Sequence, residues 1–300
     1  MMPQYLPRFA ELYERQGLRV ANVNDQLWVN YGRMIVPIGP IHKDYSISEE
    51  QAQRLMKEVP GSLMVRYTCD YRETSGFEDW YAVICDEVKD LESFHHKYRW
   101  QTKKGLKNCV VRQVDAGFIA EYGYDVYISA FSRYNDLIKP IGKNEYIKMI
   151  NATKDFDDIY HYWGVINGNK LIAYAVIALY GEETADISVA KFMPEYLKLR
   201  PGNALYYVML KYYLQDKAIH YLNAGVRSIY HKTNAYEFLI KNFSFRKANL
   251  SLRVIYNQPF SYFLKLTYPF RGVLGKVNSK LKAIYLLEEI RRKCEPAIAG

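Results

Sequence analysis

The chain has 300 residues, of which 49% are hydrophobic and 24% charged, a composition typical of a globular protein with one large or two modest domains. The longest apolar run, Leu171 to Tyr180, is too short to cross a bilayer, which excludes a membrane-spanning helix built on it. Lys and Arg (41) outnumber Asp and Glu (32), and the net charge of +9 favours an anionic partner: a phosphorylated cofactor, nucleic acid or acidic lipid.

The cysteines and the first residues bear on location. The four cysteines lie far apart, with no CxxC pair and no histidine at ligand spacing, so no metal site is predicted. They are interpreted as small buried hydrophobic residues in a reducing compartment. Prolines and charges interrupt residues 1–17, which argues against a signal peptide. We therefore expect a cytoplasmic protein, with peripheral contact to a membrane as the alternative.

Residues 1–90 are predicted to be rich in β-strands. Short strands are expected at 18–21, 27–30, 34–38, 62–67 and 80–85. Ser48 is predicted to begin a helix that ends at Glu58, because Gln51 three residues later completes a capping box. This order of elements recurs later in the chain.

A strongly basic helix is predicted from Leu91 to Lys107. Such a face is more often solvated than ligand-binding, and binding to nucleic acid is the alternative. A strand at 109–114 and helices at 116–135 and 143–152 are expected to follow. The cations of the basic helix are Lys97, Arg99, Lys103, Lys104 and Lys107.

Three antiparallel strands come next, at 158–166, 170–180 and 185–192. Asn167-Gly168 predicts a hairpin between the first two, since both central positions of a type I′ turn need a positive φ. The strand that begins at Lys170 is apolar on both faces, which predicts a central position in the sheet.

The stretch after these strands contains a helix start that suits an anion. A helix is predicted from Ala204 to Asp216 because its apolar residues repeat at the helical period. Asn203 is the predicted N-cap, and Gly202 places no side chain over the free N–H groups of the first turn. These donors and the helix dipole can hold a phosphate, with Arg200 as an added charge. The same residues also fit an ordinary capped helix that binds only water.

The remaining elements are a buried strand at 219–224, a helix at 234–242, an alternating strand at 245–256 and a basic, aromatic tail. Ala248, Leu250, Leu252 and Val254 are predicted to point inward from the alternating strand. An amphipathic helix is expected at 273–292 of the tail. We expect it to pack on the domain, and contact with an anionic membrane surface is the alternative.

The order of elements from Leu91 to Tyr256 resembles the GNAT acyltransferase superfamily. In that family, consecutive backbone N–H groups before the third helix bind the pyrophosphate of coenzyme A, within the motif Gln/Arg-x-x-Gly-x-Gly/Ala. The segment Leu199-Arg200-Pro201-Gly202-Asn203-Ala204 matches this motif at Gly202 and Ala204, and departs from it at Leu199.

A second resemblance covers residues 232–247. This segment is similar to the fourth helix of the family and the Gly-Phe strand after it, with Ser244 in place of Gly. Asn234 matches the Asn that commonly precedes that helix. Many members have a tyrosine as general acid where this chain has Ile240, so Tyr236, one turn upstream, is the candidate acid.

The segment from Tyr98 to Lys107 resembles the start of the Fem-type branch. Its members pair two GNAT-like halves and attach amino acids or acyl groups to cell-wall or surface precursors. The resemblance implies an α+β fold with a GNAT-like mixed sheet flanked by helices. It implies a degenerate GNAT-like half at 1–90, a GNAT-like acyltransferase domain at 91–257 and the basic amphipathic tail at 258–300.

The resemblance also implies the site. Acyl transfer needs a neutral nucleophile, donors for the oxyanion and a proton for the departing thiolate. Asp186, Glu183 and His231 are the candidate bases, and His231 needs no pKa shift to act near neutral pH. The residues expected to hold the cofactor, including the backbone oxyanion donors at 191–193, are Lys191, Phe192, Met193, Arg200, Gly202, Asn203, Ala204 and Asn234.

We therefore expect an N- or O-acyltransferase that uses acetyl-CoA or another acyl-CoA. The acceptor is a small molecule or a cell-surface or cell-wall precursor. The alternatives are an aminoacyl-tRNA-dependent Fem-type transferase and a non-catalytic GNAT-shaped binding protein. Lys103, Lys104 and Lys107 lie far from the Arg200 loop in the order of elements. Their charge reversal is therefore expected to leave coenzyme A binding intact, and to abolish activity only if the donor is a tRNA.

Overall fold

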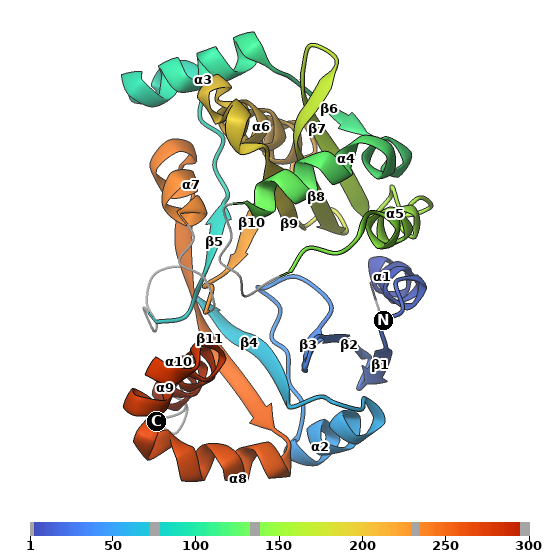
Figure 1. Ribbon diagram of the computed structural model, residues 1–300, viewed down its shortest axis with the longest axis vertical. Coiled ribbons are helices and arrows are strands. Elements are labelled where there is room, and N and C mark those ends of the chain that lie inside the picture. Colours follow the sequence, from blue (N-terminus) through green and yellow to red (C-terminus); the bar gives the residue numbers. More distant parts are fainter. Residues whose placement is uncertain (1–2, 73–78, 133–138, 230–233, 295–300) are drawn as a thin grey trace. The chain divides into compact units, whose positions relative to one another are not determined.

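The computed structural model describes residues 3–72, 79–132, 139–229 and 234–294 (Figure 1). The chain forms two compact units, and neither is one continuous segment. The first unit contains Met1–Val83, Val226–Asn234 and Lys247–Gly300. The second contains Ile84–Gly225 and Ala235–Arg246. The domain boundaries that the resemblance implies, after residues 90 and 257, stay predictions.

The first unit combines strands and helices from both ends of the chain. Its strand order is β1-β2-β3-β4-β11, in which β3 and β4 are parallel and the other neighbours antiparallel. The strands are β1 (Val20–Val23), β2 (Gln26–Tyr31), β3 (Met34–Pro37), β4 (Met64–Arg72) and β11 (Arg246–Tyr256). The helices are α1 (Tyr5–Arg15), which the sequence did not predict, α2 (Glu49–Glu58), α8 (Gln258–Thr267), α9 (Arg271–Val277) and α10 (Ser279–Cys294).

Two local predictions in this unit are confirmed. Ser48 caps α2: its side chain accepts the N–H of Gln51, whose own side chain accepts the N–H of Ser48. In β11 the alternate residues predicted to point inward are buried, with Ala248 and Leu252 at 0% exposure. Local hydrogen bonding and period-2 patterning are therefore sufficient signals for these two elements.

The tail differs from the single helix expected at 273–292. Helix α9 ends at Val277 and α10 begins at Ser279, because Asn278 has extended backbone angles (φ −138°, ψ 114°). The Asn278 side chain accepts the N–H groups of Lys280 and Leu281, as an N-cap does. Helix α10 packs as expected, with Tyr285, Leu287 and Ile290 buried.

The second unit is a mixed sheet with helices on both faces (Figure 1). Its strand order is β5-β10-β9-β8-β7-β6, in which β9 and β10 are parallel and β6 to β9 pair antiparallel. The strands are β5 (Tyr81–Cys85), β6 (Val110–Val114), β7 (Tyr160–Asn167), β8 (Lys170–Tyr180), β9 (Thr184–Phe192) and β10 (Tyr221–Val226). The helices are α3 (His96–Asn108), α4 (Ala116–Phe131), α5 (Lys143–Asn151), α6 (Pro201–Leu210) and α7 (Ala235–Phe243).

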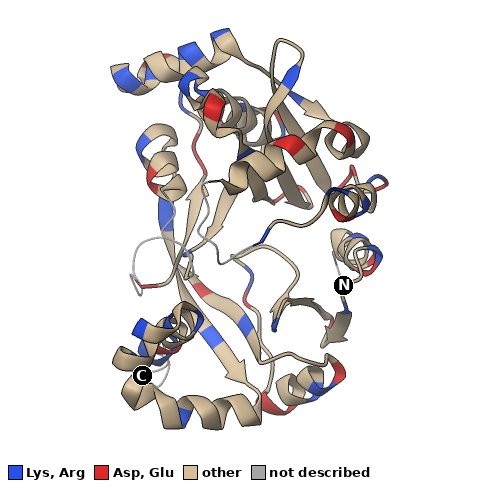
Figure 2. Ribbon diagram, in the orientation of Figure 1, with Lys and Arg blue, Asp and Glu red and all other residues tan. Residues whose placement is uncertain are grey.

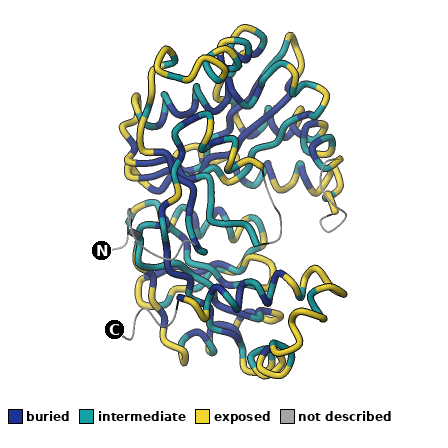
Figure 3. The backbone as a smooth tube through the Cα atoms, turned by 90° about the vertical axis from the view of Figure 1, so that its left-hand side faces the viewer, coloured by how far each residue is buried: buried dark blue, intermediate teal, exposed yellow. Residues whose placement is uncertain are grey.

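The core of this unit lies on both sides of β8, which is buried from Leu171 to its end. Figure 3 shows how buried and exposed residues are distributed along the chain. Tyr174 and Val176 pack in a cluster with residues of α4 and α5. On the opposite face, Trp163 of β7 donates a hydrogen bond to the hydroxyl of Tyr213 at 2.9 Å. The central position predicted for β8 is confirmed, as is the α+β fold with a mixed sheet flanked by helices.

Two helix boundaries in the second unit were predicted wrongly. The basic helix expected from Leu91 is a short 3-10 turn (Leu91–Ser93) followed by α3, because Phe94 and His95 are extended. Helix α6 begins at Pro201, three residues before the expected start, and passes into a π-helix at Lys211–Asp216. Proline is favoured at the first helical position, because the N–H that it lacks would have no partner within the helix there.

Neither the charged residues nor the possible metal ligands locate a functional site. Lys and Arg residues of α3 and of the tail lie on exposed helices (Figure 2). In the described residues, no helix is both long and apolar enough to cross a membrane. Across the same ranges, no group of three or more His, Cys, Asp and Glu side chains is placed to hold a metal ion. All four cysteines are free, and three of them are buried.

Candidate active site where β9 and β10 separate

The parallel strands β9 and β10 pair over a short distance. Their register joins Thr184 to Tyr221, Ala185 to Leu222 and Asp186 to Asn223. Beyond Asp186, β9 continues to Phe192 in register with β8 alone. The two strands therefore separate after Asp186, on the side of the sheet where the chain enters α6.

A β-bulge lies beside this point of separation. Val176 of β8 pairs with Val189, and the next residue, Ile177, pairs with Ile187. Ser188 is thus an extra residue in β9, and it is exposed. Bulges leave a backbone residue outside the ladder and are frequent next to active sites. Sequence reasoning missed this position because no residue type marks it.

Asp186 lies at the base of the separated strands and is hydrogen-bonded. Asn223 donates from Nδ2 to Oδ1 of Asp186 at 3.0 Å, and its own Oδ1 accepts the N–H of Gly225 at 2.9 Å. Burial raises the pKa of the Asp186 carboxyl to about 7, although the Asn223 hydrogen bond lowers it in part. The carboxyl group can therefore exchange a proton near neutral pH.

Tyr236 of α7 reaches the same stretch of β10. A Cβ atom built on Gly225 would lie 3.2 Å from the Tyr236 hydroxyl, and Gly225 has a φ of +107° that side chains rarely allow. The structure thus brings two of the three predicted catalytic residues to the Asn223–Gly225 segment. The third, His231, lies outside the described residues.

The first turn of α6 is built differently from the prediction. Arg200 has left-handed backbone angles (φ 65°, ψ 43°), and its carbonyl accepts the N–H groups of Asn203 and Ala204. Asn203 is therefore not the N-cap but the third residue of the helix, and it is only 2% exposed. Pro201 has no N–H, and the N–H groups of Asn203 and Ala204 are bonded to the Arg200 carbonyl. The N–H of Gly202 is therefore the first-turn donor that these bonds do not use.

Three buried polar atoms near this turn have no hydrogen-bond partner among the described residues. They are Nε of Arg200, Nδ2 of Asn203 and Oγ1 of Thr102, a residue of α3 with 0% exposure. Buried donors are normally paired, and an unpaired one costs about 1–3 kcal/mol. An anion bound at the start of α6 would satisfy such donors, and Thr102 is a residue that sequence reasoning missed.

Helix α3 packs directly on this turn. A Cβ on Gly105 would lie 2.5 Å from the Arg200 carbonyl oxygen and 3.1 Å from the Ala204 nitrogen. Thr102 is one turn before Gly105, on the same face of α3. Lys103, Lys104 and Lys107 are far from the Arg200 loop in the order of elements, but the helix that carries them packs on that loop. The cause of this packing is Gly105, which has no side chain to hold the two backbones apart. The expectation that their charge reversal leaves coenzyme A binding intact stays a prediction.

Aromatic rings border the same turn on its other side. A Cβ on Gly202 would lie 3.5 Å from the ring of Phe192 and 3.8 Å from that of Phe238. The ring of Tyr206 packs between them, with centroids 6.4 Å from Phe192 and 6.0 Å from Phe238. Phe192 therefore contributes an apolar wall, in addition to any backbone contact.

The other residues predicted for the site lie in different surroundings. The N–H of Met193 donates to the Ile172 carbonyl at 2.9 Å, so it is not a free oxyanion donor. Lys191 places its ammonium 4.9 Å from the ring of Phe131. Asn234 is exposed and directly precedes α7, as in the motif. Ser244 has a φ of +59°, the backbone conformation that favours the glycine it replaces.

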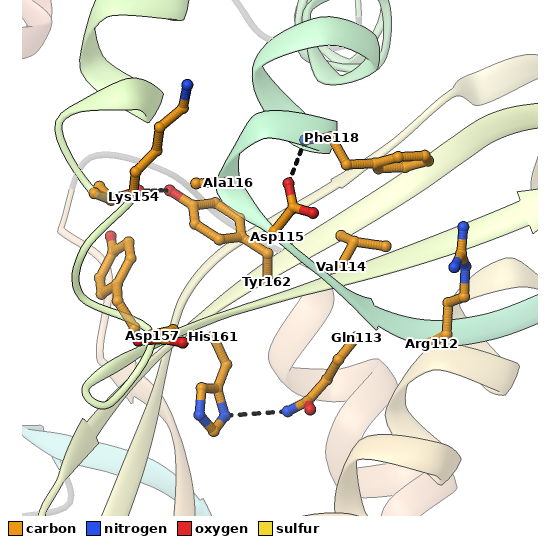
Figure 4. Close-up of a pocket in the computed structure, with 12 residues that line it drawn as sticks. Arg112, Gln113, Val114, Asp115, Ala116, Phe118, Lys154, Asp157, His161 and Tyr162 are labelled. Atoms are coloured by element: carbon orange, nitrogen blue, oxygen red, sulfur yellow. Dashed lines mark hydrogen bonds between the residues drawn. The ribbon is translucent and has the colours of Figure 1, made fainter.

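A cavity of about 440 Å³ lies beside β6 and the start of β7 (Figure 4). The register puts its residue Tyr162 level with Val176 of β8 and Val189 of β9, so β8 and β9 lie between the cavity and the place where β9 and β10 separate. Two of its polar groups are bonded within the protein: Asp115 accepts the N–H of Phe118, and Nδ1 of His161 lies 2.8 Å from the Tyr213 hydroxyl. Burial, and then Lys217, lowers the pKa of His161. We assign this cavity no part in acyl-donor binding.

Comparisons with known proteins bear on the fold alone. No protein-family model matches the sequence, and a search of curated proteins finds no match. Among solved structures, FemX superimposes with a TM-score of 0.56 and 10% sequence identity, over 86% of this chain and 93% of FemX. A tandem GNAT protein from the clavulanic acid biosynthesis pathway gives 0.45 and 7% identity, over 77% of this chain and 78% of its own. A GCN5-related N-acetyltransferase-like protein from Streptococcus suis gives 0.39 and 10% identity, over 86% and 100%. The chain has a GNAT-like fold that resembles the Fem type.

Proposed function

We propose that this chain, whose GNAT-like fold resembles that of FemX, is an acyl-CoA-dependent N- or O-acyltransferase. The observation that carries the proposal is the arrangement of Asp186, Asn223, Gly225 and Tyr236 where β9 and β10 separate. The first turn of α6, with its unpaired buried donors, supports an anionic donor substrate on the same side of the sheet.

The residues at the start of α6 fit a phosphorylated donor such as acetyl-CoA or another acyl-CoA. Arg200 Nε and Asn203 Nδ2 are buried donors in need of an acceptor, and the N–H of Gly202 lies in the turn between them. The positive end of the helix dipole adds to the attraction of a phosphate. When bound, the cofactor supplies the activated thioester.

The residues at the separated strands would move the protons. Asp186, with its pKa of about 7, takes a proton from the attacking amine or hydroxyl of the acceptor. With an acyl-CoA bound, the Tyr236 hydroxyl would give a proton to the thiolate sulfur that leaves after the acceptor has added to the acyl carbonyl. The bulge at Ser188 is the candidate source of a backbone N–H for the oxyanion, in place of Met193.

The test is release of free thiol from acetyl-CoA and longer acyl-CoAs in the presence of amine and hydroxyl acceptors, including cell-surface or cell-wall precursors. Tyr236→Phe should lower turnover by roughly 10²–10⁴-fold without weakening donor binding, because a general acid acts in the transition state. Tyr122→Phe, at an exposed position of α4, is the matched control and should leave turnover unchanged. An active Tyr236→Phe enzyme would remove this residue from the mechanism.

A specific observation favours a second candidate, an aminoacyl-tRNA-dependent Fem-type transferase. Pro201 removes one N–H from the turn that would cradle a pyrophosphate, and basic α3 packs against that turn at Gly105. A tRNA donor would bind with an affinity that falls steeply as salt rises, through counterion release. Charge reversal at Lys104 and Lys107 should then abolish transfer and flatten the salt dependence together. Failure of both donors to bind would leave a non-catalytic GNAT-shaped protein.

A further inference from the structure

Exposed apolar side chains gather in one short segment of the first unit. Half of the large hydrophobic side chains that are exposed in the described chain lie between residues 262 and 277, within α8, the 3-10 turn at Tyr268–Phe270 and α9. Their exposed fractions reach 74% for Leu266 and 83% for Val277. The set is Tyr262, Phe263, Leu266, Phe270, Val273 and Val277.

The spacing of these residues is that of a helix face. Tyr262, Leu266, Phe270, Val273 and Val277 follow one another at intervals of three or four positions. Buried residues of α8 lie elsewhere: Leu264 is its buried apolar contact, and α9 has no buried residue. The segment therefore presents its apolar face outward, whereas α10 packs its apolar face inward.

The charged residues along this segment of the sequence have a single sign. No Asp or Glu occurs between Glu237 and Glu288 in the sequence. The five cations of residues 258–287 are all exposed, and in the described part of the chain none of them forms an ion pair with a carboxylate. They are Lys265, Arg271, Lys276, Lys280 and Lys282.

We infer that α8, α9 and the start of α10 form a surface that binds an anionic lipid bilayer. Exposed aromatic and aliphatic side chains would insert at the level of the headgroups, and the flanking lysines would meet the phosphates. Apolar residues combined with unpaired cations fit a bilayer better than a protein groove, since a groove would have to supply matching carboxylates. The inference does not depend on acyl transfer.

The experiment is co-sedimentation of the full chain with phosphatidylcholine vesicles, with and without about 30% phosphatidylglycerol, at low and high salt. The wild type should sediment with the anionic vesicles, and less so at high salt. Changing Lys265, Lys276 and Lys280 to Gln should lower the partition coefficient about five-fold for each lysine removed. Leu266→Ser with Phe270→Ser and Val277→Ser should lower it on anionic vesicles at both salt concentrations.

The matched control is Tyr122→Ser with Ile128→Ser, exposed apolar residues of α4 in the other unit. Sedimentation of this control should equal that of the wild type. Equal recovery of the wild type with neutral and anionic vesicles, or no effect of either set of changes in the tail, would overturn the inference. So would self-association of the wild type in ultracentrifugation that the Leu266, Phe270 and Val277 changes abolish without any vesicle binding, since the face would then belong to a second copy.

Discussion

At the scale of single residues, Asp186 is the group whose chemistry the fold has changed most usefully. Its carboxyl would have a pKa of about 3.9 in an unfolded chain, and burial raises the pKa to about 7 in the folded protein. The folded state therefore binds the proton more tightly. The contribution of Asp186 to stability is full below about pH 4 and is lost as the pH rises to about 7.

Asp186→Asn should thus have an effect that depends on pH. Relative to the wild type, the variant should gain on the order of 4 kcal/mol in free energy of unfolding between about pH 4 and about pH 8, because it carries no charge to bury. Urea denaturation of both proteins at the two pH values measures this. The same difference in free energy of unfolding at both pH values would show that folding does not shift the pKa of the Asp186 carboxyl.

In acyl transfer, the wild-type rate should rise with pH up to about 7, and the Asp186→Asn variant should lose that rise.

At the scale of elements, the contact between α3 and α6 defines the candidate donor site. Gly105→Ala would place a methyl group 2.5 Å from the Arg200 carbonyl, which is backbone and cannot rotate away. We expect a loss of about 1–3 kcal/mol in the free energy of unfolding, as for other overpacked sites, and weaker donor binding. Gly272→Ala is the control: nothing lies within 4 Å of its new Cβ, so this change should be neutral or stabilising. Urea denaturation that ranks Gly105→Ala with Gly272→Ala would argue against the close packing.

Elements with a local signal could be predicted from the sequence. The capping box of Ser48 and Gln51 located α2, and the apolar run from Leu171 located β8. The start of α6 was misplaced because Arg200 takes a left-handed conformation and Pro201 opens the helix, so that Asn203 lies inside it. Pro at the first helical position was the available signal.

Contacts between distant residues were harder to predict. Asp186 could be proposed from its strand, but its partner Asn223 follows only from the parallel register of β9 and β10 across α6. The bulge at Ser188 depends on pairing with β8, and no residue type encodes it. Gly105 meets Arg200 through packing of two helices, which periodicity within either helix does not report.

At the scale of the whole molecule, the cations behind the net charge of +9 include two groups whose proposed functions differ. Separate experiments can test each group. The cations of α3 belong to the second unit, beside the candidate donor site, and those of the tail belong to the first. Removal of the tail lysines should therefore change vesicle binding and leave coenzyme A binding as it is. A loss of both would contradict this division of the charge.

The most direct test of the central claim is the free energy of unfolding with and without coenzyme A, for the wild type and for Gly202→Val. If the first turn of α6 holds the phosphates, coenzyme A at a hundred times its dissociation constant should stabilise the wild type by about 2.7 kcal/mol. Gly202→Val would fill the space beside Phe192 and Phe238, so the same coenzyme A concentration should give no stabilisation, while Gly272→Val should respond like the wild type. An equal response in Gly202→Val, or none in the wild type, would contradict the assignment of this turn as the donor site.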